Sequence, residues 1–157
     1  IHPLKYHDRA RIGSYLGRRL GRRVKEKLNL ELDVLIPVPL HPVKYRERGY
    51  NQAWWICRGL SRELQLPVWP KAIKRVKYTI SQTTLDREER QNNMQLAFRT
   101  RKDMAGITVA IIDDVFTTGS TISSLAGVIK DAGVKTVVAL TVAALLDHLN
   151  DTLPESL

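Results

Sequence analysis

The chain has 157 residues, of which 43% are hydrophobic, and this composition excludes an intrinsically disordered polymer. No apolar run reaches the roughly 18 residues of a membrane span, and we find no secretory signal. The formal net charge of +9 indicates attraction to polyanions, whether nucleic acid, phosphorylated metabolites or acidic lipid, although a basic surface also serves solubility. The length suits one domain, which we predict over residues 1–157, and a first residue other than Met suggests a piece of a longer protein.

The first predicted element is a helix over residues 9–28. Its apolar residues repeat at i, i+4 and predict one buried stripe, formed by Ile12, Leu16, Leu20, Val24 and Leu28. The opposite face is basic and carries Arg18, Arg19, Arg22, Arg23, Lys25 and Lys27. This face is either a solvated surface or a site for a polyanion, and the sequence leaves both open.

The middle of the chain predicts a buried strand, a loop and a second helix. Residues 33–38 form the strand, which the prolines that follow bring to an end. We interpret "VKYRERGYNQ", residues 43–52, as a polar, basic loop that pivots at Gly49. Residues 53–64 repeat as a helix, and residues 72–76 predict a short strand. Residues 77–95 lack apolar periodicity, and loops of this length tend to be functional or disordered.

The last third of the chain alternates strand, helix and strand, over residues 107–112, 120–132 and 136–144. Gly133 is a natural residue to follow the end of the helix. Together with the earlier elements, this order predicts an α/β fold with a mainly parallel central sheet flanked by helices. Ligands of such sheets bind at the carboxyl ends of the strands, and the Asp113–Asp114 pair follows one of these ends.

Cysteine and histidine use argues against two kinds of chemistry. The single cysteine, Cys57, cannot form an internal disulfide, which indicates a reducing cytoplasm, and its apolar helical setting predicts a core thiol rather than a nucleophile. The four histidines form no pair with ligand spacing, so we predict no zinc site in this chain.

The stretch "VAIIDDVFTTGST", Val109–Thr121, is the most informative in the sequence. Carboxylates at the end of a strand can accept hydrogen bonds from the vicinal hydroxyls of a ribose and can favour Mg²⁺. The turn that follows offers hydroxyls, a glycine and the first N–H groups of a helix, which together suit a phosphate. This order of groups predicts a site for a sugar 5-phosphate.

Three other readings of the stretch are weaker. Thr118 or Ser120 could be an ordinary helix N-cap, with the aspartates serving solubility. A Walker P-loop is excluded because GxxxxGK[ST] is absent, and a dinucleotide fingerprint is excluded because no GxGxxG follows a strand.

These residues carry a family resemblance. "VAIIDDVFTTGST" resembles the 13-residue phosphoribosyl pyrophosphate (PRPP) motif of type I phosphoribosyltransferases, which have a Rossmann-like fold. In the order "IPVPLHPVKYRERGYNQA", "SQTTLDREERQNNMQLAF" and the Asp-Asp turn, the chain also resembles the ComF family of competence-linked proteins, over nearly its whole length.

The resemblance implies a role for each segment. Asp113 and Asp114 would hold the ribose hydroxyls of PRPP with Mg²⁺ alongside. The 5-phosphate would lie on the turn formed by Thr117, Thr118, Gly119, Ser120 and Thr121. Residues 39–49 would form the pyrophosphate loop, whose positive charges are Lys44, Arg46 and Arg48. Residues 79–93 would match the loop that closes over the site, with Arg87 and Arg90 either neutralising pyrophosphate or serving as solvated charges.

The sequence departs from the family pattern at two points. The cysteine-rich zinc segment that often begins ComF proteins is not part of this sequence, which either begins after it or comes from a lineage that lacks it. Purine-salvage enzymes place an acidic residue at the position of Thr117, where it acts on the base, and a threonine cannot replace it. Purine salvage is therefore not expected, and the acceptor is undetermined.

Two functional hypotheses remain. The first is a PRPP-dependent phosphoribosyltransferase-like protein with a role in natural competence, DNA uptake and transformation. In its mechanism the groups around the sugar would stabilise an oxocarbenium-like ribose and the departing diphosphate. The second is a non-catalytic protein that keeps the fold and binds single-stranded DNA, with DNA-uptake or recombination proteins as partners. Whether catalysis occurs, and the oligomeric state, cannot be read from the sequence.

Overall fold

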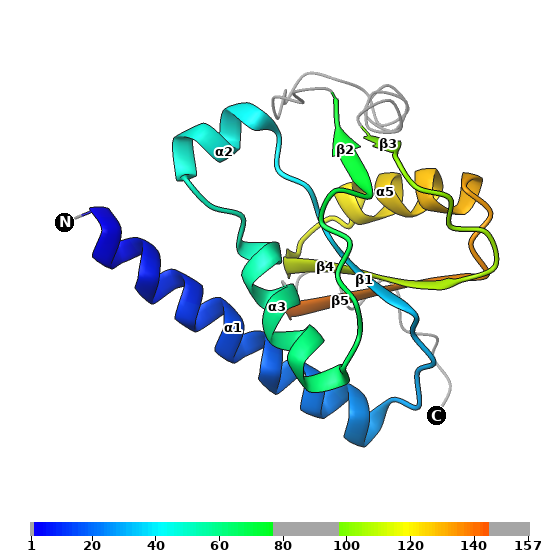
Figure 1. Ribbon diagram of the computed structural model, residues 1–157, viewed down its shortest axis with the longest axis horizontal. Helices are drawn as coiled ribbons and strands as arrows, with labels where there is room; N and C mark the ends of the chain where they lie inside the picture. The colour runs from blue at the N-terminus through cyan, green and yellow to red at the C-terminus, as the bar shows by residue number, and fades with distance from the viewer. Residues whose placement is uncertain (1, 77–97, 145–157) are drawn as a thin grey trace.

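The computed structural model describes residues 2–76 and 98–144, with side chains from Ala10 onward. Three parallel strands form its central sheet, in the order β1-β4-β5 (Figure 1). They are β1 (Val34–Pro37), β4 (Thr108–Phe116) and β5 (Thr136–Ala144). A separate antiparallel pair joins β2 (Ile73–Arg75) to β3 (Phe98–Thr100). The predicted α/β class with a mainly parallel sheet is confirmed.

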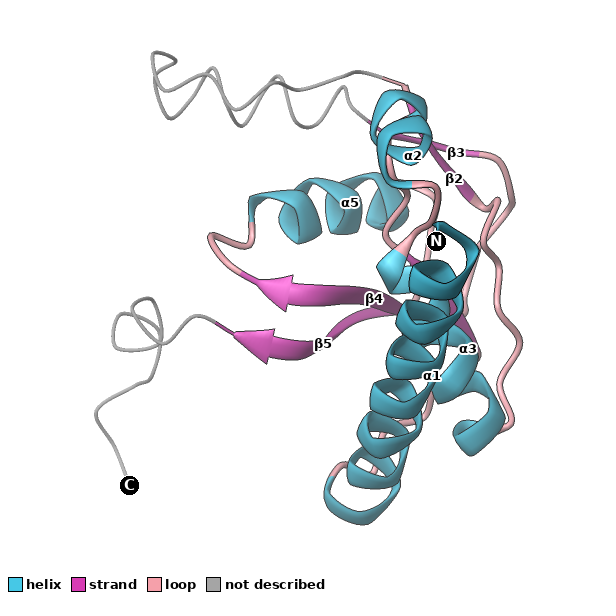
Figure 2. Ribbon diagram, turned by 90° about the vertical axis from the view of Figure 1, so that its left-hand side faces the viewer, coloured by secondary structure: helices cyan, strands magenta, loops and turns pink. Residues whose placement is uncertain are grey.

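Helices cover both faces of the sheet (Figure 2). One face packs against α3 (Gln52–Leu64) and α1 (His2–Lys27), and its core includes Leu35, Ile56 and Ala110. The other face packs against α5 (Ser120–Asp131) and the β2–β3 pair. Successive residues of β1 and β4 alternate between these two cores, as the period of a strand requires. A buried strand between two apolar layers explains the continuous apolar run that ends at Ile112.

Glycines set the contact between α1 and α3. Gly13, Gly17 and Gly21 recur every four residues on α1, so they form one face of the helix. A Cβ atom on Gly17 would meet the carbonyl oxygen of Ile56, and one on Gly59 of α3 would meet the carbonyl oxygen of Ser14. The two helix backbones therefore touch, at a separation that no side chain permits.

This contact corrects the predicted stripe on the first helix. Val24 is buried, but Ile12 is 57% exposed and Leu28 is 47% exposed. Each i, i+4 step advances about 40° beyond a full turn, so five such residues spread over about 160° of the helix surface. Ile12 consequently lies about 140° from Gly17, on the side away from α3, whereas Leu28 lies just beyond Lys27, the last residue of α1. The helix also begins at His2, well before the predicted residue 9.

Most other elements lie where the sequence predicts them, with two exceptions in the described part of the chain. Residues 42–48 form a helix, α2 (Pro42–Arg48), rather than part of a loop. Proline at its first position and a His41 side chain that accepts a hydrogen bond from the Val43 N–H explain its start. Strand β3 was not predicted, because three residues are too few to show a period. Gly133 takes the expected left-handed conformation after α5.

The remaining sequence predictions concern Cys57 and membrane spans. Cys57 is fully buried, and burial raises the pKa of its thiol to about 12, so it is a core residue as predicted. Within the described residues, no helix has the length and apolar character needed to cross a membrane.

Candidate phosphoribosyl pyrophosphate site

The carboxyl end of the central strand holds the Asp-Asp pair. Both aspartates lie inside β4, which continues to Phe116, so the expectation that the strand ends at Ile112 is wrong. The extension is stabilised by β5, whose Ala143 and Ala144 pair with the last residues of β4. On the other side of β4, the ladder to β1 ends with the Val38 N–H donating to the Ile112 carbonyl. Asp113 therefore lies where one neighbouring strand has stopped and the other continues.

Asp113 and Asp114 are both partly buried. The Oδ1 atom of Asp113 accepts a hydrogen bond of 2.9 Å from the Asp114 N–H. Burial raises the pKa of the Asp113 carboxyl to about 6, and the nearby Asp114 charge adds to the rise, while the Asp114 N–H and the Arg75 guanidinium oppose it. The carboxyl therefore changes charge near neutral pH.

The turn after β4 leads into α5 through a left-handed glycine. Gly119 has φ 72° and is the N-cap residue, and no side chain caps the first turn of the helix. The alternative of a Thr118 or Ser120 side-chain cap is therefore wrong. Those two hydroxyls instead lie 3.0 Å apart and hydrogen-bond to each other. The first N–H groups of α5 are left to another acceptor, and the helix dipole favours an anion there.

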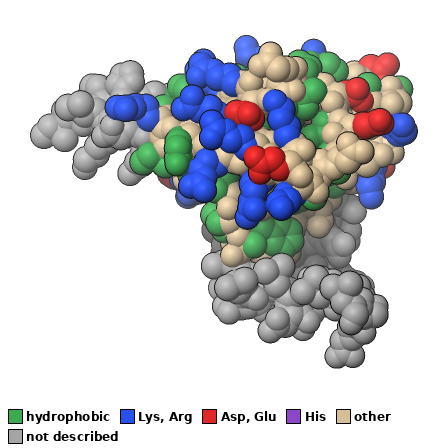
Figure 3. All heavy atoms as spheres, turned by 90° about the horizontal axis from the view of Figure 1, so that it is seen from below, with side chains coloured by type: hydrophobic (Ala, Val, Ile, Leu, Met, Phe, Trp, Pro, Cys, Tyr) green, Lys and Arg blue, Asp and Glu red, His purple; other side chains and the backbone are tan. Residues whose placement is uncertain are grey.

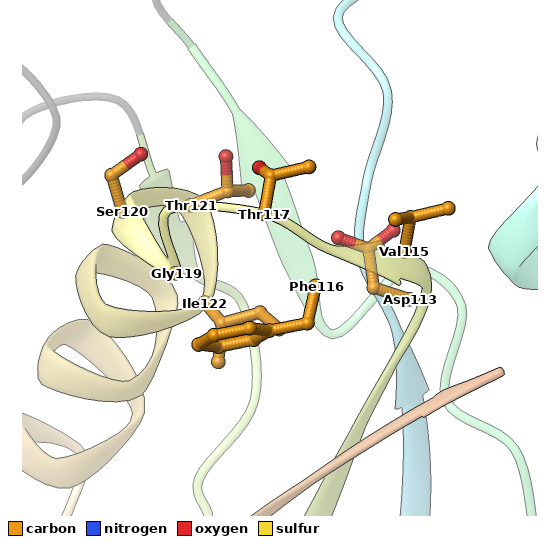
Figure 4. Close-up of a pocket in the computed structure, with 8 residues that line it drawn as sticks. All are labelled: Asp113, Val115, Phe116, Thr117, Gly119, Ser120, Thr121 and Ile122. Atoms are coloured by element: carbon orange, nitrogen blue, oxygen red, sulfur yellow. The ribbon is translucent and has the colours of Figure 1, made fainter. Parts of the chain in front are cut away.

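A pocket with about 220 Å³ of empty space joins the strand end to the turn. Figure 4 shows the Asp113 carboxylate and the Thr117, Ser120 and Thr121 hydroxyls pointing to the same side of the chain, away from the Phe116 ring. The pocket is lined by Asp113, Val115, Phe116, Thr117, Gly119, Ser120, Thr121 and Ile122. Asp114 and Thr118 are not among these residues. For Asp114, the alternation of side chains along a strand explains the difference.

Gly119 is also sterically required in this pocket. A Cβ atom there would lie 2.8 Å from the tip of the Phe116 ring. Glycine is therefore required at this position for two reasons: the φ angle favours glycine, and the Phe116 ring leaves no room for a side chain.

The predicted basic residues of segment 39–49 lie on α2 and do not share one face. Lys44 and Arg48 are four residues apart and lie on the same side, whereas Arg46 lies about 200° from Lys44. Lys44 forms an ion pair of 3.2 Å with Glu47, and Arg48 donates to the Gln52 side chain at 3.0 Å. The helix begins a few residues beyond the end of β1, and the Asn51 side chain ties its far end to the Val38 carbonyl.

Arg75 is a candidate site residue that the sequence analysis missed. It ends β2, is partly buried, and its guanidinium lies 5.5 Å from the centre of the Phe98 ring. Burial lowers the pKa of Arg75, and attraction to Asp113 opposes this change. The two charges come from strands in different sheets, so no local sequence pattern could have paired them. The predicted closing segment, residues 79–93 with Arg87 and Arg90, lies outside the described residues.

The described residues include no cluster of three or more His, Cys, Asp or Glu side chains that could enclose a metal ion. Mg²⁺ commonly binds through one or two carboxylates together with phosphates of the substrate. The Asp113–Asp114 pair, beside a helix start that has no side-chain cap, fits such a shared site and does not fit a metal site built from protein ligands alone.

Proteins of known sequence resemble this chain over most of its length. It is 37% identical over 141 residues to the DNA utilization protein YhgH of Escherichia coli O157:H7, and 34% identical over 144 residues to competence protein F of Haemophilus influenzae. Each match covers 87% of this chain. The resemblance to the ComF family is confirmed. The chain spans 62–63% of the length of these two relatives, and no protein-family model matches it.

Solved structures agree on the fold. The glutamine PRPP amidotransferase of B. subtilis superposes on 83% of the chain with a TM-score of 0.57 and 17% identity, covering 26% of that enzyme. The purine phosphoribosyltransferase of Pyrococcus horikoshii superposes on 83% of the chain, at a TM-score of 0.52 and 20% identity, with 70% of that protein covered. The chain therefore has the type I phosphoribosyltransferase fold that the sequence predicted.

Proposed function

We propose that this ComF-like chain binds PRPP together with Mg²⁺ at the carboxyl end of β4. The observation that supports the proposal is one pocket with a carboxylate at one end and, at the other, hydroxyl groups and a helix start that has no side-chain cap. Asp113 lies at the first end, and Thr117, Gly119, Ser120 and Thr121 lie at the second, where α5 starts. A ribose 5-phosphate held across this pocket would place its diol and its phosphate on groups of the right chemistry.

Each part of the pocket has a separate task in this proposal. Asp113 accepts hydrogen bonds from the 2- and 3-hydroxyls of the ribose, and Asp114, which does not line the pocket, favours cations at its edge. The turn donates N–H and O–H groups to the 5-phosphate. Bound Mg²⁺ would supply charge neutralisation on the diphosphate. In this proposal Arg75 and the basic residues of α2 supply positive charge that stabilises the departing diphosphate.

The acceptor in a transfer reaction is not defined by this pocket. Thr117 is exposed and carries a hydroxyl, which is a poor general base at neutral pH compared with a carboxylate. Similarity to purine phosphoribosyltransferases does not supply such a base. This chain shares their fold but has Thr117 at the position where, by the resemblance, they carry an acidic residue. We therefore propose PRPP binding first, and phosphoribosyl transfer as the reaction to be tested with it.

Calorimetry tests the binding. PRPP with Mg²⁺ should bind the wild type, and the Asp113→Asn/Asp114→Asn variant should lose at least tenfold in affinity, because two charge-assisted hydrogen bonds are weakened. A Lys130→Gln/Lys135→Gln variant, which changes two exposed residues away from the pocket, is the matched control. Absence of wild-type binding, or equal binding by the double aspartate variant, would reject the proposal.

The relatives' names, DNA utilization protein and competence protein, support a role for the protein in DNA utilization and competence. A second candidate function in such a role is the binding of single-stranded DNA. The chain's net charge of +9 is compatible with it. Because the two functions use different groups, one protein can have both. A fluorescence-anisotropy titration with a labelled oligothymidylate should show binding that weakens steeply as salt rises, and an absence of binding at low salt would reject this candidate.

A further inference from the structure

The outer face of α1 combines arginines with an exposed aromatic ring. Tyr15 is 53% exposed, on the side of the helix about 160° from Gly17, which faces α3. Four arginines lie within about 60° of Tyr15 around the helix axis. They are Arg11, Arg18, Arg19 and Arg22, and all four are exposed.

The glycine contact explains why this face is presented so fully. Because α1 and α3 touch backbone to backbone, α3 covers only the narrow side of α1 that carries the glycines. The opposite side has no acidic residue between Ala10 and Lys25 in the sequence. At its far end, Glu63 of α3 lies 3.7 Å from Arg22 and 4.0 Å from Lys25, so the positive charge is partly compensated there. Figure 3, which views the molecule from below, shows many Lys and Arg side chains on one face, with a few Asp and Glu side chains among them.

The size and chemistry of the face favour a flexible polyanion with exposed bases. From Arg11 to Arg22 the helix rises about 16 Å, a distance long enough to meet several phosphates of one nucleic-acid strand. An exposed tyrosine among arginines is an arrangement on which an unpaired base can stack while the phosphates meet the guanidinium groups. A duplex buries its bases and cannot use the ring. A lipid surface would need a broader apolar face than Tyr15 and Ile12 provide.

We infer that the outer face of α1 is the binding surface for single-stranded DNA, and that Tyr15 selects single strands by stacking on a base. This inference rests on the proposed binding of single-stranded DNA and gives that function a location. The surface is separate from the PRPP pocket, since α1 covers one face of the sheet and the pocket opens at the carboxyl end of β4. The two ligands therefore use different residues.

Anisotropy titrations of point variants with single-stranded oligothymidylate and with duplex DNA test the assignment. Tyr15→Leu should weaken single-strand binding about tenfold and leave duplex binding unchanged, whereas Tyr15→Phe, which keeps the ring, should bind as the wild type does. Ile12→Ser is the matched control, because Ile12 is 57% exposed on the same helix and has no ring to stack. This variant should retain single-strand affinity.

Two double variants distinguish the effect of the charges on the outer face of α1 from the effect of the net charge of the chain. Arg18→Gln/Arg19→Gln should reduce affinity and lower the slope of log affinity against log salt by about 1.4, whereas Lys130→Gln/Lys135→Gln removes the same charge from the α5 side and should reduce both less. If the wild type binds single strands but Tyr15→Leu or the arginine variant binds equally well, the location is wrong and the proposed function survives. If the wild type binds no single strand, the function itself fails. Equal losses with Tyr15→Leu and Ile12→Ser, together with binding to anionic phosphatidylserine vesicles, would identify a lipid surface and also overturn the inference.

Discussion

The α1–α3 contact and the turn after β4 use glycine for opposite purposes. In the helix pair, Gly17 and Gly59 remove side chains so that two backbones touch and leave no space. In the turn, Gly119 adopts a left-handed conformation and leaves N–H and hydroxyl groups facing a pocket. The first arrangement maximises packing, whereas the second leaves polar groups uncovered. We therefore expect the α1–α3 contact to stabilise the fold and the turn after β4 to bind the ligand. Four predictions test this division.

The largest effect should follow a change at the helix contact. Gly17→Ala places a methyl group against the Ile56 carbonyl and the Leu60 N–H, so α1 must move away from α3. We expect the free energy of unfolding to fall by about 3 kcal/mol, measured by urea denaturation. The contact also involves α1's other glycines, so the loss should appear as a reduced midpoint for the whole domain.

Gly127→Ala is the matched control for this prediction. Gly127 is also a helical glycine, but a Cβ atom there meets nothing within 4 Å. It should raise the free energy of unfolding by about 0.5–1 kcal/mol, because alanine is the better helix former. If Gly17→Ala were also stabilising, the close contact of α1 with α3 would be refuted.

The second effect concerns the turn. Gly119→Ala must accept φ 72° and a methyl group 2.8 Å from the Phe116 ring, and we expect a loss of about 2 kcal/mol in the free energy of unfolding together with weaker PRPP binding. Gly106→Ala separates the two causes, since Gly106 has φ 75° with nothing within 4 Å of a Cβ. It should lose only about 1 kcal/mol. Equal losses for both variants would mean that the Phe116 contact has no effect.

The same contrast explains what could be predicted from the sequence. The pocket residues are neighbours in the chain, so their order alone indicated a strand, a turn and a helix start, and the structure places them around one pocket. The helix contact could not be predicted in this way. Its glycines were visible at Gly13, Gly17 and Gly21, but their partner on α3 lies about 40 residues away and follows no period.

The position of Arg75 near Asp113 and the helical structure of α2 could not be predicted from the sequence, for related reasons. Arg75 approaches Asp113 only because β2 belongs to a second sheet that packs over the first. Helix α2 is seven residues long and mostly polar, so its composition suggested a loop, and only its capping contacts and the left-handed Gly49 define it. Elements whose structure depends on distant partners or on one capping bond leave little trace in a local pattern.

The third prediction concerns the charge of Asp113. With ¹³C labelling, its carboxyl signal should titrate near pH 6 in the free protein, since burial raises the pKa to about 6. Binding of PRPP with Mg²⁺ favours the ionised form, so the midpoint should fall by at least one unit, which by linkage corresponds to about tenfold tighter binding above pH 6 than at acid pH. The measurement follows the protein signal, so titration of the ligand does not obscure it. An unchanged midpoint on binding would show that the carboxylate does not contact the ligand complex.

The smallest effect should have the opposite sign to the first two. Between pH 3.8 and about 6 the folded protein holds a proton on Asp113 that the unfolded chain has released, so stability falls as pH rises through this range. At neutral pH the ionised carboxyl is therefore unfavourable in the fold, and Asp113→Asn should raise the free energy of unfolding by about 1 kcal/mol, since the side chain retains some contact with water. This gain in stability should vanish below pH 4, where the carboxyl is protonated in both the folded and the unfolded state. Asp33→Asn is the contrasting control and should not raise the stability. The Asp33 carboxylate accepts a hydrogen bond of 2.7 Å from the Thr108 N–H, and this bond supports the fold. An Asp113→Asn variant that is more stable but fails to bind PRPP would show that the pocket residue Asp113 lowers the stability of the fold. The α1–α3 contact, in contrast, raises it. A variant no more stable at pH 7 than the wild type would show that the Asp113 charge is as well solvated in the fold as in the unfolded chain.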